Sequence, residues 1–243
     1  MKIYKYWIIG SLIFLVALPL EAQKVSMLDG SNDMSFTPGY GVITTRKAQK
    51  EATIGSVYWH EEWFLGNILT KDAKLVEKIN LRYDIFNNQL EVKMEDGIRL
   101  LYGNEVKSFE YEDAAKENHV FVNALDFEVE NSSTRLNTFF EILARGQRYA
   151  LFSHQKLEFQ EAGYVSALDV GSKSDKINKK ETLYLLTAKD APLKVVKKNK
   201  KDFLGLFSEQ ESAKIINFVE TNHLSYAKRE DIIKMMNFLN TIE

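Results

Sequence analysis

The chain contains no cysteine. This absence excludes disulfide bonds, thiolate zinc sites, iron–sulfur clusters and cysteine nucleophiles, so stability must come from an ordinary packed core. Secreted eukaryotic domains of this size usually carry disulfides, and an exported chain without them therefore favours a bacterial export route.

The sequence also lacks the short motifs of common catalytic and nucleotide-binding sites. It has no G-x-S-x-G nucleophile elbow, no P-loop and no D-x-D-x-D calcium loop. Gly39-Tyr-Gly41 is not followed by a third glycine, so it is not a dinucleotide fingerprint. The sequence therefore assigns no catalytic residue, no metal ligand and no cofactor, and an enzyme is the less favoured class.

Neither sign of charge dominates, because 32 Lys and Arg face 34 Asp and Glu, for a formal net charge of −2. A near-neutral chain offers no general attraction for nucleic acid, so no nucleic-acid partner is expected.

The N-terminus has the pattern of a secretory signal peptide. Lys2 and Lys5 precede an apolar run over residues 7–20, and Ala22 supplies a small residue at the expected cleavage point. We predict a signal peptide over residues 1–22 and cleavage after Ala22 or Gln23. No later segment has 18 consecutive apolar residues, so no transmembrane span is expected after cleavage. Because no cysteine follows the cleavage point, the exported chain is not expected to be a lipoprotein. The expected location is the periplasm or the periphery of the outer membrane.

Three further regions follow from composition and periodicity. Residues 23–54 are rich in Gly, Ser, Asn and Asp and are predicted to form a flexible N-terminal arm. Residues 55–198 have repeated strand patterns and are predicted to form an antiparallel β-domain. Residues 199–243 change to helical periodicity and are predicted to form a helical segment packed on that domain.

The clearest strand pattern lies in "KINLRYDIFNNQLEVKM", where apolar and polar residues alternate over 79–85 and 90–94. Asn87-Asn88 is predicted to form a two-residue hairpin turn, because Asn tolerates positive φ. Asp96-Gly97 and Gly103-Asn104 are further turn signals. The pattern predicts a meander of at least four strands up to residue 112.

Further strands are predicted over 119–130, 138–146 and 148–160, and a hairpin with strands in 181–188 and 193–197. The polar residues 161–180 are predicted to be a mobile loop. In the C-terminal region, Ser208 and Glu211 match a capping box, and Ser225 is predicted to cap a second helix. A short helix is expected around 202–207. The fold class is therefore α+β: mainly an antiparallel meander, as a sandwich or partial barrel, with a C-terminal helical hairpin.

The segment Tyr58-Trp-His-Glu-Glu-Trp-Phe64 concentrates aromatic and titratable residues. A metalloprotease helix needs H-E-x-x-H, and Phe64 stands where the second His would be. Glu61 and Glu62 would point to opposite sides of a strand and cannot flank one bond. We therefore expect the aromatic residues to anchor a strand and His60, Glu61 and Glu62 to face water. The alternative is an exposed aromatic patch that binds a sugar or a partner protein.

Arg82 alternates away from Leu81 and Tyr83, so it shares a strand face with Asn80 and Asp84. A cross-strand ion pair with Glu91 or Glu95 is the simpler prediction, and a ligand-binding Arg is the alternative. The candidate ligand- or partner-binding residues are therefore Tyr58, Trp59, Trp63 and Arg82. The remaining histidines have no His, Asp or Glu at ligand spacing and are expected to be surface or core residues; they are His119, His154 and His223.

The stretch from residue 55 to 101 resembles exported proteins of Bacteroidetes-type bacteria. The matching positions are Gly55, Ser56, Tyr58, Trp63, Gly66, Leu81, Arg82, Tyr83, Asp84, Ile85, Phe86, Leu90 and Glu91. The C-terminal "AKREDIIKMMNFLN" is similar as well. This resemblance implies export and a Gram-negative envelope address, and its motif is structural in character.

The address and the missing catalytic motifs together favour a non-enzymatic interaction or binding module of the envelope, whose partner would be another envelope protein. A carrier or sensor that binds a small apolar or sugar ligand inside the β-domain is the alternative. A hydrolase that uses an unrecognised carboxylate pair is the third reading.

Overall fold

A computed structural model describes residues 53–163 and 174–242 of the 243-residue chain. By its contacts the chain is divided after Lys47. The described residues all follow this division. The predicted signal peptide, nearly all of the predicted N-terminal arm, and residues 164–173 of the predicted loop lie outside them.

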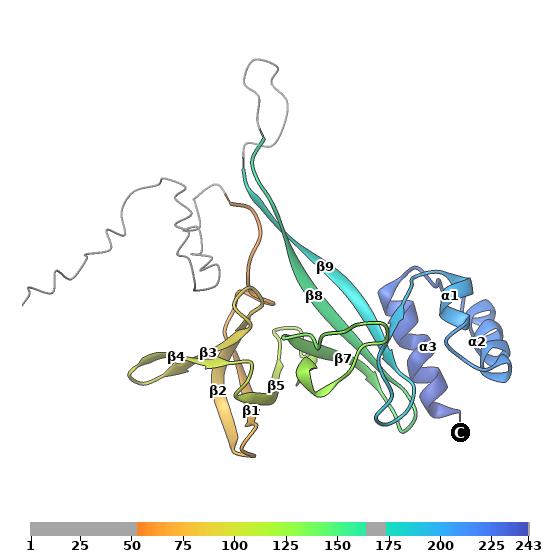
Figure 1. The fold of residues 1–243 in the computed structure, drawn as a ribbon, viewed down its shortest axis with the longest axis horizontal. Coiled ribbons are helices and arrows are strands. Elements are labelled where there is room, and N and C mark those ends of the chain that lie inside the picture. Colours follow the sequence, from red (N-terminus) through yellow and green to blue (C-terminus); the bar gives the residue numbers. More distant parts are fainter. Residues whose placement is uncertain (1–52, 164–173, 243) are drawn as a thin grey trace, which may run out of the picture. The chain divides into compact units, whose positions relative to one another are not determined.

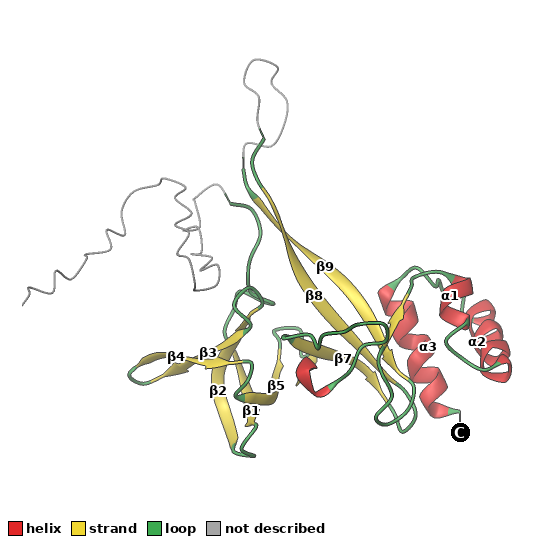
Figure 2. Ribbon diagram, viewed as in Figure 1, coloured by secondary structure: helices red, strands yellow, loops and turns green. Residues whose placement is uncertain are grey.

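The described residues form an α+β fold built on one antiparallel sheet (Figures 1 and 2). The strands are β1 Phe64–Thr70, β2 Leu75–Asp84, β3 Gln89–Met94, β4 Gly97–Tyr102, β5 Val106–Glu112, β6 Asn118–Asn123, β7 Phe139–Arg145, β8 Ala150–Gln160, β9 Lys176–Leu186 and β10 Lys194–Val196. A 3-10 turn, Ala124–Asp126, follows β6. The helices are α1 Lys200–Leu204, α2 Glu209–Thr221 and α3 Arg229–Thr241.

All ten described strands belong to a single sheet in the order β10-β9-β8-β7-β6-β5-β1-β2-β3-β4. The predicted fold class is confirmed. Of the two arrangements left open, a sandwich would need two sheets and is not the one adopted.

The hairpins β2–β3 and β3–β4 lie where the sequence predicts them. The first turn is longer than predicted, because Asp84 pairs with Gln89 and leaves a four-residue loop. Only Asn88 in that loop has positive φ, at 48°. The Asp84 carboxylate accepts hydrogen bonds from the Asn87 backbone N–H and side-chain amide, so a carboxylate at the strand end closes the loop.

The predicted four-strand meander is wrong at its last step. β5 does not pair with β4; it pairs with β1, with Ile68 opposite Phe109, and with β6 on its other side. The turn after β4 therefore carries the chain to the opposite edge of β1. The buried side-chain amide of Asn123 donates to the carbonyl oxygens of Gly103 and Val106 and so fixes this turn.

Aromatic rings fill the interior between β1–β6, the start of β7 and the preceding segment 57–59. Tyr83, Phe109, Phe121 and Phe139 are fully buried. The rings of Phe109 and Phe121 stack with centroids 4.5 Å apart, and Trp59 meets Phe121 edge-on at 5.0 Å. Each such side chain stabilises the fold by about 1.5–3 kcal/mol through burial.

The helices cover one face of β7–β9 (Figure 2) and share a second apolar core with it. Ile232, Met236 and Leu239 of α3 are buried there with Leu151 and Leu183 of the sheet. This arrangement agrees with the predicted helical segment packed on the β-domain. The opposite face of β7–β9 forms a third cluster, which includes Phe140, Phe152, Tyr184 and Leu193.

The predicted capping box of α2 is confirmed, since the Ser208 hydroxyl accepts from the Glu211 N–H while the Glu211 carboxylate accepts from the Ser208 N–H. The predicted cap at Ser225 is wrong. α3 begins at Arg229 after Lys228, and Ser225 instead donates its backbone N–H to the Asp231 carboxylate in the first turn. A carboxylate in the first turn of a helix can accept a hydrogen bond from the chain before the helix instead of from the N–H groups of the helix itself.

The predicted loop 161–180 is wrong for its last five residues, because β9 begins at Lys176. β8 and β9 pair without interruption from Ala150–Leu186 to Gln160–Lys176. Ile54 forms a parallel bridge with Lys176, so the end of the predicted arm is held against this ribbon.

Candidate functional site

Three of the four predicted binding residues converge on one face of the sheet. Arg82 projects from β2, and Tyr58 and Trp63 precede β1. The Arg82 guanidinium carbon lies 4.0 Å from the Tyr58 ring centroid and 4.6 Å from that of Trp63. A guanidinium between two rings is held by cation–π attraction on both of its faces.

The same guanidinium makes the simpler contact that the sequence predicts. Arg82 lies directly opposite Glu91 on β3, with Nη2 2.6 Å and Nε 2.8 Å from Glu91 Oε2. The Tyr58 hydroxyl donates to Glu91 Oε1 at 3.0 Å. Burial and this bond to Glu91 raise the pKa of Tyr58. The side chains of this cluster are thus preorganised, because they already bind one another through hydrogen bonds and an ion pair.

Trp59, the fourth predicted residue, points the other way. It is 5 % exposed and packs against Tyr83 and Phe121. Trp59 therefore belongs to the core, as expected for a strand anchor, and does not join the surface cluster.

Glu61 and Glu62 are exposed as predicted, but the prediction that His60 faces water is wrong. The His60 ring is half-buried and lies edge-on to Phe64 and His119, with ring centroids 5.5 and 5.1 Å away. Its Nδ1 lies 3.2 Å from the Tyr111 hydroxyl. The reason is that the segment crosses over β5 and β6 instead of extending into solvent.

Beside the Arg82 cluster, β4 exposes an apolar row that was not anticipated. Ile98, Leu100 and Tyr102 are 58 %, 40 % and 54 % exposed. Leu100 lies directly opposite Glu91, so this row adjoins the Arg82 cluster on one face. The signal was present in "GIRLLY", where an apolar residue occupies every second position of a strand that ends the sheet.

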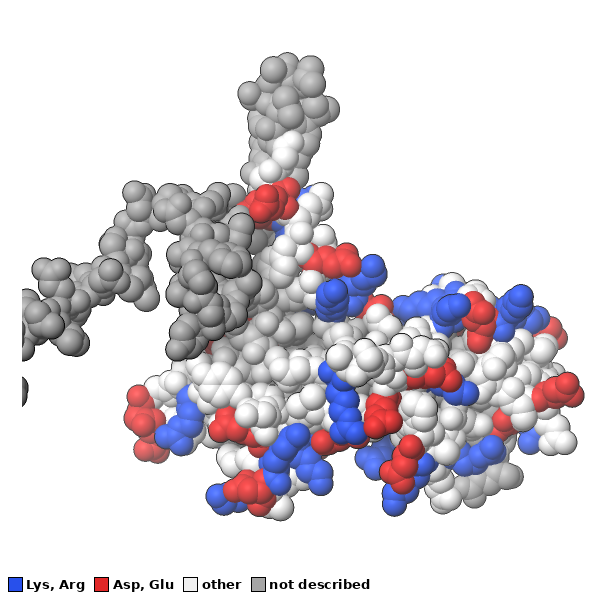
Figure 3. Space-filling model, viewed as in Figure 1, with Lys and Arg blue, Asp and Glu red and all other residues white. Residues whose placement is uncertain are grey.

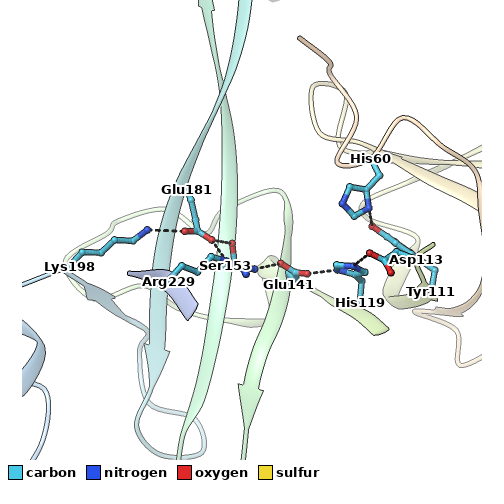
Figure 4. Close-up of polar contacts among 9 residues, drawn as sticks. All are labelled: His60, Tyr111, Asp113, His119, Glu141, Ser153, Glu181, Lys198 and Arg229. Carbon is cyan, nitrogen blue, oxygen red and sulfur yellow. Dashed lines mark hydrogen bonds and ion pairs between the residues drawn. The ribbon is translucent and has the colours of Figure 1, made fainter. Parts of the chain in front are cut away.

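A second polar feature crosses the sheet from α3 to β5 (Figure 4). On β6, His119 Nδ1 lies 2.6 Å from Glu141 Oε1 of β7, and Nε2 lies 3.3 Å from Asp113 Oδ2. His119 was expected to be a surface or core residue, and the structure makes it a largely buried residue paired with two carboxylates. The β5–β6 turn brings Asp113 back toward His119, and sheet pairing brings Glu141, neither of which is visible as residue spacing.

Arg229 extends this chain into the helical segment (Figure 4). Its Nη2 lies 3.1 Å from Glu141 Oε2, and its Nε lies 2.8 Å from Glu181 Oε1. Glu181 also accepts from the Ser153 hydroxyl and from Lys198. Burial alone would raise the pKa of Glu181, but the hydrogen bonds from Lys198, Ser153 and Arg229 lower it. Glu181 is therefore held as an anion by its hydrogen-bond and ion-pair partners.

The pKa values of the two facing histidines are shifted in opposite directions. The hydrogen bond to Glu141 raises the pKa of His119, whereas burial, and then the charge of His119, lower the pKa of His60. Burial also raises the pKa of Tyr111, whose hydroxyl lies within hydrogen-bond distance of His60 Nδ1.

Asp113, Glu117 and His119 are the described residues that could hold a metal ion, with one donor atom from each within 4.8 Å of the others. Both ring nitrogens of His119 already face carboxylates, and the Asp113 Oδ1 accepts from the backbone of Ala115 and Glu117. A protonated imidazole between two carboxylates, next to a capped turn, accounts for this geometry without an ion.

A groove of about 280 Å³ lies beside β1 and β5. Its lining combines the polar side chains of Asn67, Glu77, Lys78 and Glu110 with apolar surface that includes Leu65. The interior next to it is filled by aromatic rings. On the face seen in Figure 3, acidic and basic side chains are interspersed.

Within the described part of the chain, no helix is both long enough and apolar enough to cross a bilayer. Comparison of the chain with protein-family models, curated proteins and solved structures gave no match.

Proposed function

We propose that this chain is an exported, non-enzymatic interaction module of the periplasm or the outer-membrane periphery, and that it binds another envelope protein through the outer face of β2–β4. The observation that carries the proposal is the exposed row of Ile98, Leu100 and Tyr102 on the terminal strand. Contiguous exposed apolar side chains on a sheet edge are uncommon unless a partner covers them.

The Arg82 cluster supports the same assignment. Aromatic residues and Arg are enriched at the energetic centres of protein interfaces. Tyr58, Trp63 and Arg82 are already ordered by Glu91, so a partner would lose little side-chain entropy on docking against them. The address comes from the signal-peptide pattern of residues 1–22 and from the family resemblance.

The proposed cellular location is tested by sequencing the N-terminus of the protein recovered from the envelope of the producing bacterium. The expected mature chain begins at Gln23 or Lys24 in the periplasmic or outer-membrane fraction. Recovery of an unprocessed chain from the cytosol would refute it.

The interaction is tested by placing a photoreactive amino acid at position 100 in the producing bacterium, with position 209 on the exposed start of α2 as the control. The expected result is one defined adduct from position 100, identified by mass spectrometry and rebuilt with purified proteins. Trp63→Ala should weaken the rebuilt complex. Identical adducts from both positions, or none from position 100, would count against the proposal.

A second candidate is binding of a sugar in the groove beside β1. Asn67, Glu77, Lys78 and Glu110 supply the donors and acceptors that hydroxyl groups need. Isothermal titration with a panel of envelope glycans would decide it, since Asn67→Ala should abolish any heat that the wild type gives.

A further inference from the structure

Among the described residues, the sheet ends in β10 on one side and in β4 on the other, and only β10 has features that hinder strand addition. β10 has three residues, begins with Lys194, is followed by Lys197, and leads into the helical segment. A short terminal strand and Lys residues along it both hinder the addition of a further strand. β4 has six residues, and Figure 1 shows the β3–β4 hairpin projecting from the rest of this part of the sheet. Its one charged residue is Arg99.

The backbone of β4 directs alternate hydrogen-bonding groups outward. The Gly103 N–H bonds to the Asn88 carbonyl across the hairpin. In an antiparallel pair such bonding residues alternate with residues whose N–H and C=O point away. Ile98, Leu100 and Tyr102 are the residues that point away from β3.

Tyr102 shows this orientation directly, because its N–H donates to the Glu105 carboxylate and its C=O accepts from the Glu105 N–H. Glu105 therefore caps one end of the outward-facing edge. Within residues 53–163 and 174–242, the outward N–H and C=O groups of Ile98 and Leu100 have no hydrogen-bond partner, so they are the groups that an incoming strand would bind.

The side chains around these N–H and C=O groups indicate which kind of strand would pair with β4. The outer face is the apolar row of β4. The opposite face carries Arg99, and Lys93 lies beside Ile98 on the outer face. Neither Arg99 nor Lys93 has a carboxylate partner among residues 53–163 and 174–242, although both are exposed. A strand that matches this edge has apolar residues facing the apolar row and a carboxylate facing Arg99.

We propose that β4 is a strand-addition edge that takes an extended acidic–apolar segment of a partner protein, paired antiparallel through Ile98 and Leu100. The proposal rests on the proposed function, because it specifies the partner of that surface. A second copy of this chain is a poorer match, since it brings another Arg99 to the same face and the same apolar residues without a carboxylate. Main-chain bonds would give the affinity, and Arg99 would select the partner by charge.

The probe is a fluorescent peptide, acetyl-Val-Thr-Val-Glu-Val-amide, which places its Glu opposite Arg99. The matched control peptide has Lys in place of Glu. Binding is followed by fluorescence anisotropy to the mature protein. The acidic peptide should bind about tenfold more tightly than the basic peptide, and Arg99→Glu should reverse this preference.

Leu100→Pro tests the main-chain contribution. The Leu100 N–H points away from β3, so proline removes an outward donor and leaves the β3–β4 bonds in place. This variant should keep the circular dichroism and thermal transition of the wild type and lose binding of both peptides. Leu100→Lys, a second edge-blocking change, should do the same.

Three results would overturn the proposal: no binding of the acidic peptide, equal binding of both peptides, or unchanged binding by Leu100→Pro. Sedimentation equilibrium tests whether a second copy of this chain occupies the edge. A wild-type dimer that Leu100→Pro dissociates would assign the edge to that second copy. If Leu100→Pro still forms the rebuilt complex of the proposed function, that function stands and the strand-addition edge is refuted.

Discussion

Arg82 on β2 and Glu91 on β3 are direct cross-strand partners, with Nη2 and Oε2 2.6 Å apart and the guanidinium lying between the rings of Tyr58 and Trp63. The side chains of Arg82 and Glu91 are 21 % and 11 % exposed, so this pair is partly withdrawn from water. This ion pair should therefore contribute more to the free energy of unfolding than a fully exposed ion pair does.

We expect Arg82→Ala to lower the free energy of unfolding by about 1–3 kcal/mol, because the largely buried Glu91 is left without its cation. Arg82→Lys should recover only part of this loss, since an ammonium cannot stack between two rings. Urea unfolding of both variants, with a double-mutant cycle on Glu91→Ala, measures the coupling. The control is Arg135→Ala, which removes an exposed pair with Glu128 and should cost at most about 1 kcal/mol.

Gly66→Ala should lower the free energy of unfolding by about 1–3 kcal/mol by overpacking. A Cβ at Gly66 would collide with the carbonyl oxygen of Glu110 and press on Leu81 and Tyr111. The matched control is Gly163→Ala, where a Cβ would meet nothing within 4 Å. Thermal unfolding checks both, and equal transitions would disprove the close β1–β5 approach.

His119→Gln should change how stability depends on pH. The pKa of His119 is raised above its usual 6.5, mainly by the bond to Glu141, so its stabilising contribution is full below about pH 6.5 and is lost as the pH rises through the folded-state pKa. The difference in free energy of unfolding between wild type and variant should therefore shrink from pH 6 to pH 9. The control for the substitution itself is His223→Gln, an exposed change between α2 and α3.

Arg229→Met should weaken the attachment of α3 to the sheet. It leaves Glu141 and Glu181 without their shared cation, and the expected loss is about 1–3 kcal/mol, below that of a fully buried pair because Arg229 is one-third exposed. Amide hydrogen exchange should accelerate in α3 before β1–β5. Because Arg229 helps to lower the pKa of Glu181, the variant should also lose less stability as the pH falls below about 4.5. Arg148→Met, which removes a more exposed pair with Glu211, is the control.

Local patterns were sufficient to predict much of this fold. The alternation in 79–94, the turn residues Asp96-Gly97 and the capping box at Ser208 each involve neighbours in sequence, and the structure contains all three. "FFEILA" was assigned correctly as a strand because of the turn that follows it.

The order of the strands in the sheet was harder to predict from the sequence. β5 has the same alternation whether it pairs with β4 or with β1, and the contacts that select β1, such as Asn67 to Glu110, join residues 43 positions apart. The His119 network is likewise assembled from separate strands and a helix. One signal was available: Glu141 interrupts an apolar strand run, and a carboxylate in such a place needs a partner.

The place of β1 in the sheet has a kinetic consequence. A chain delivered from its N-terminus, at the ribosome or at a translocon, presents β1 to β4 before β5 exists to complete the pairing of β1. The aromatic core stays open for longer still, because Phe139 closes it from β7. During that interval Leu81, Tyr83 and Leu90 are uncovered on the early hairpins. We therefore expect folding of this half to be limited by non-local pairing, with this apolar surface exposed until β7 arrives.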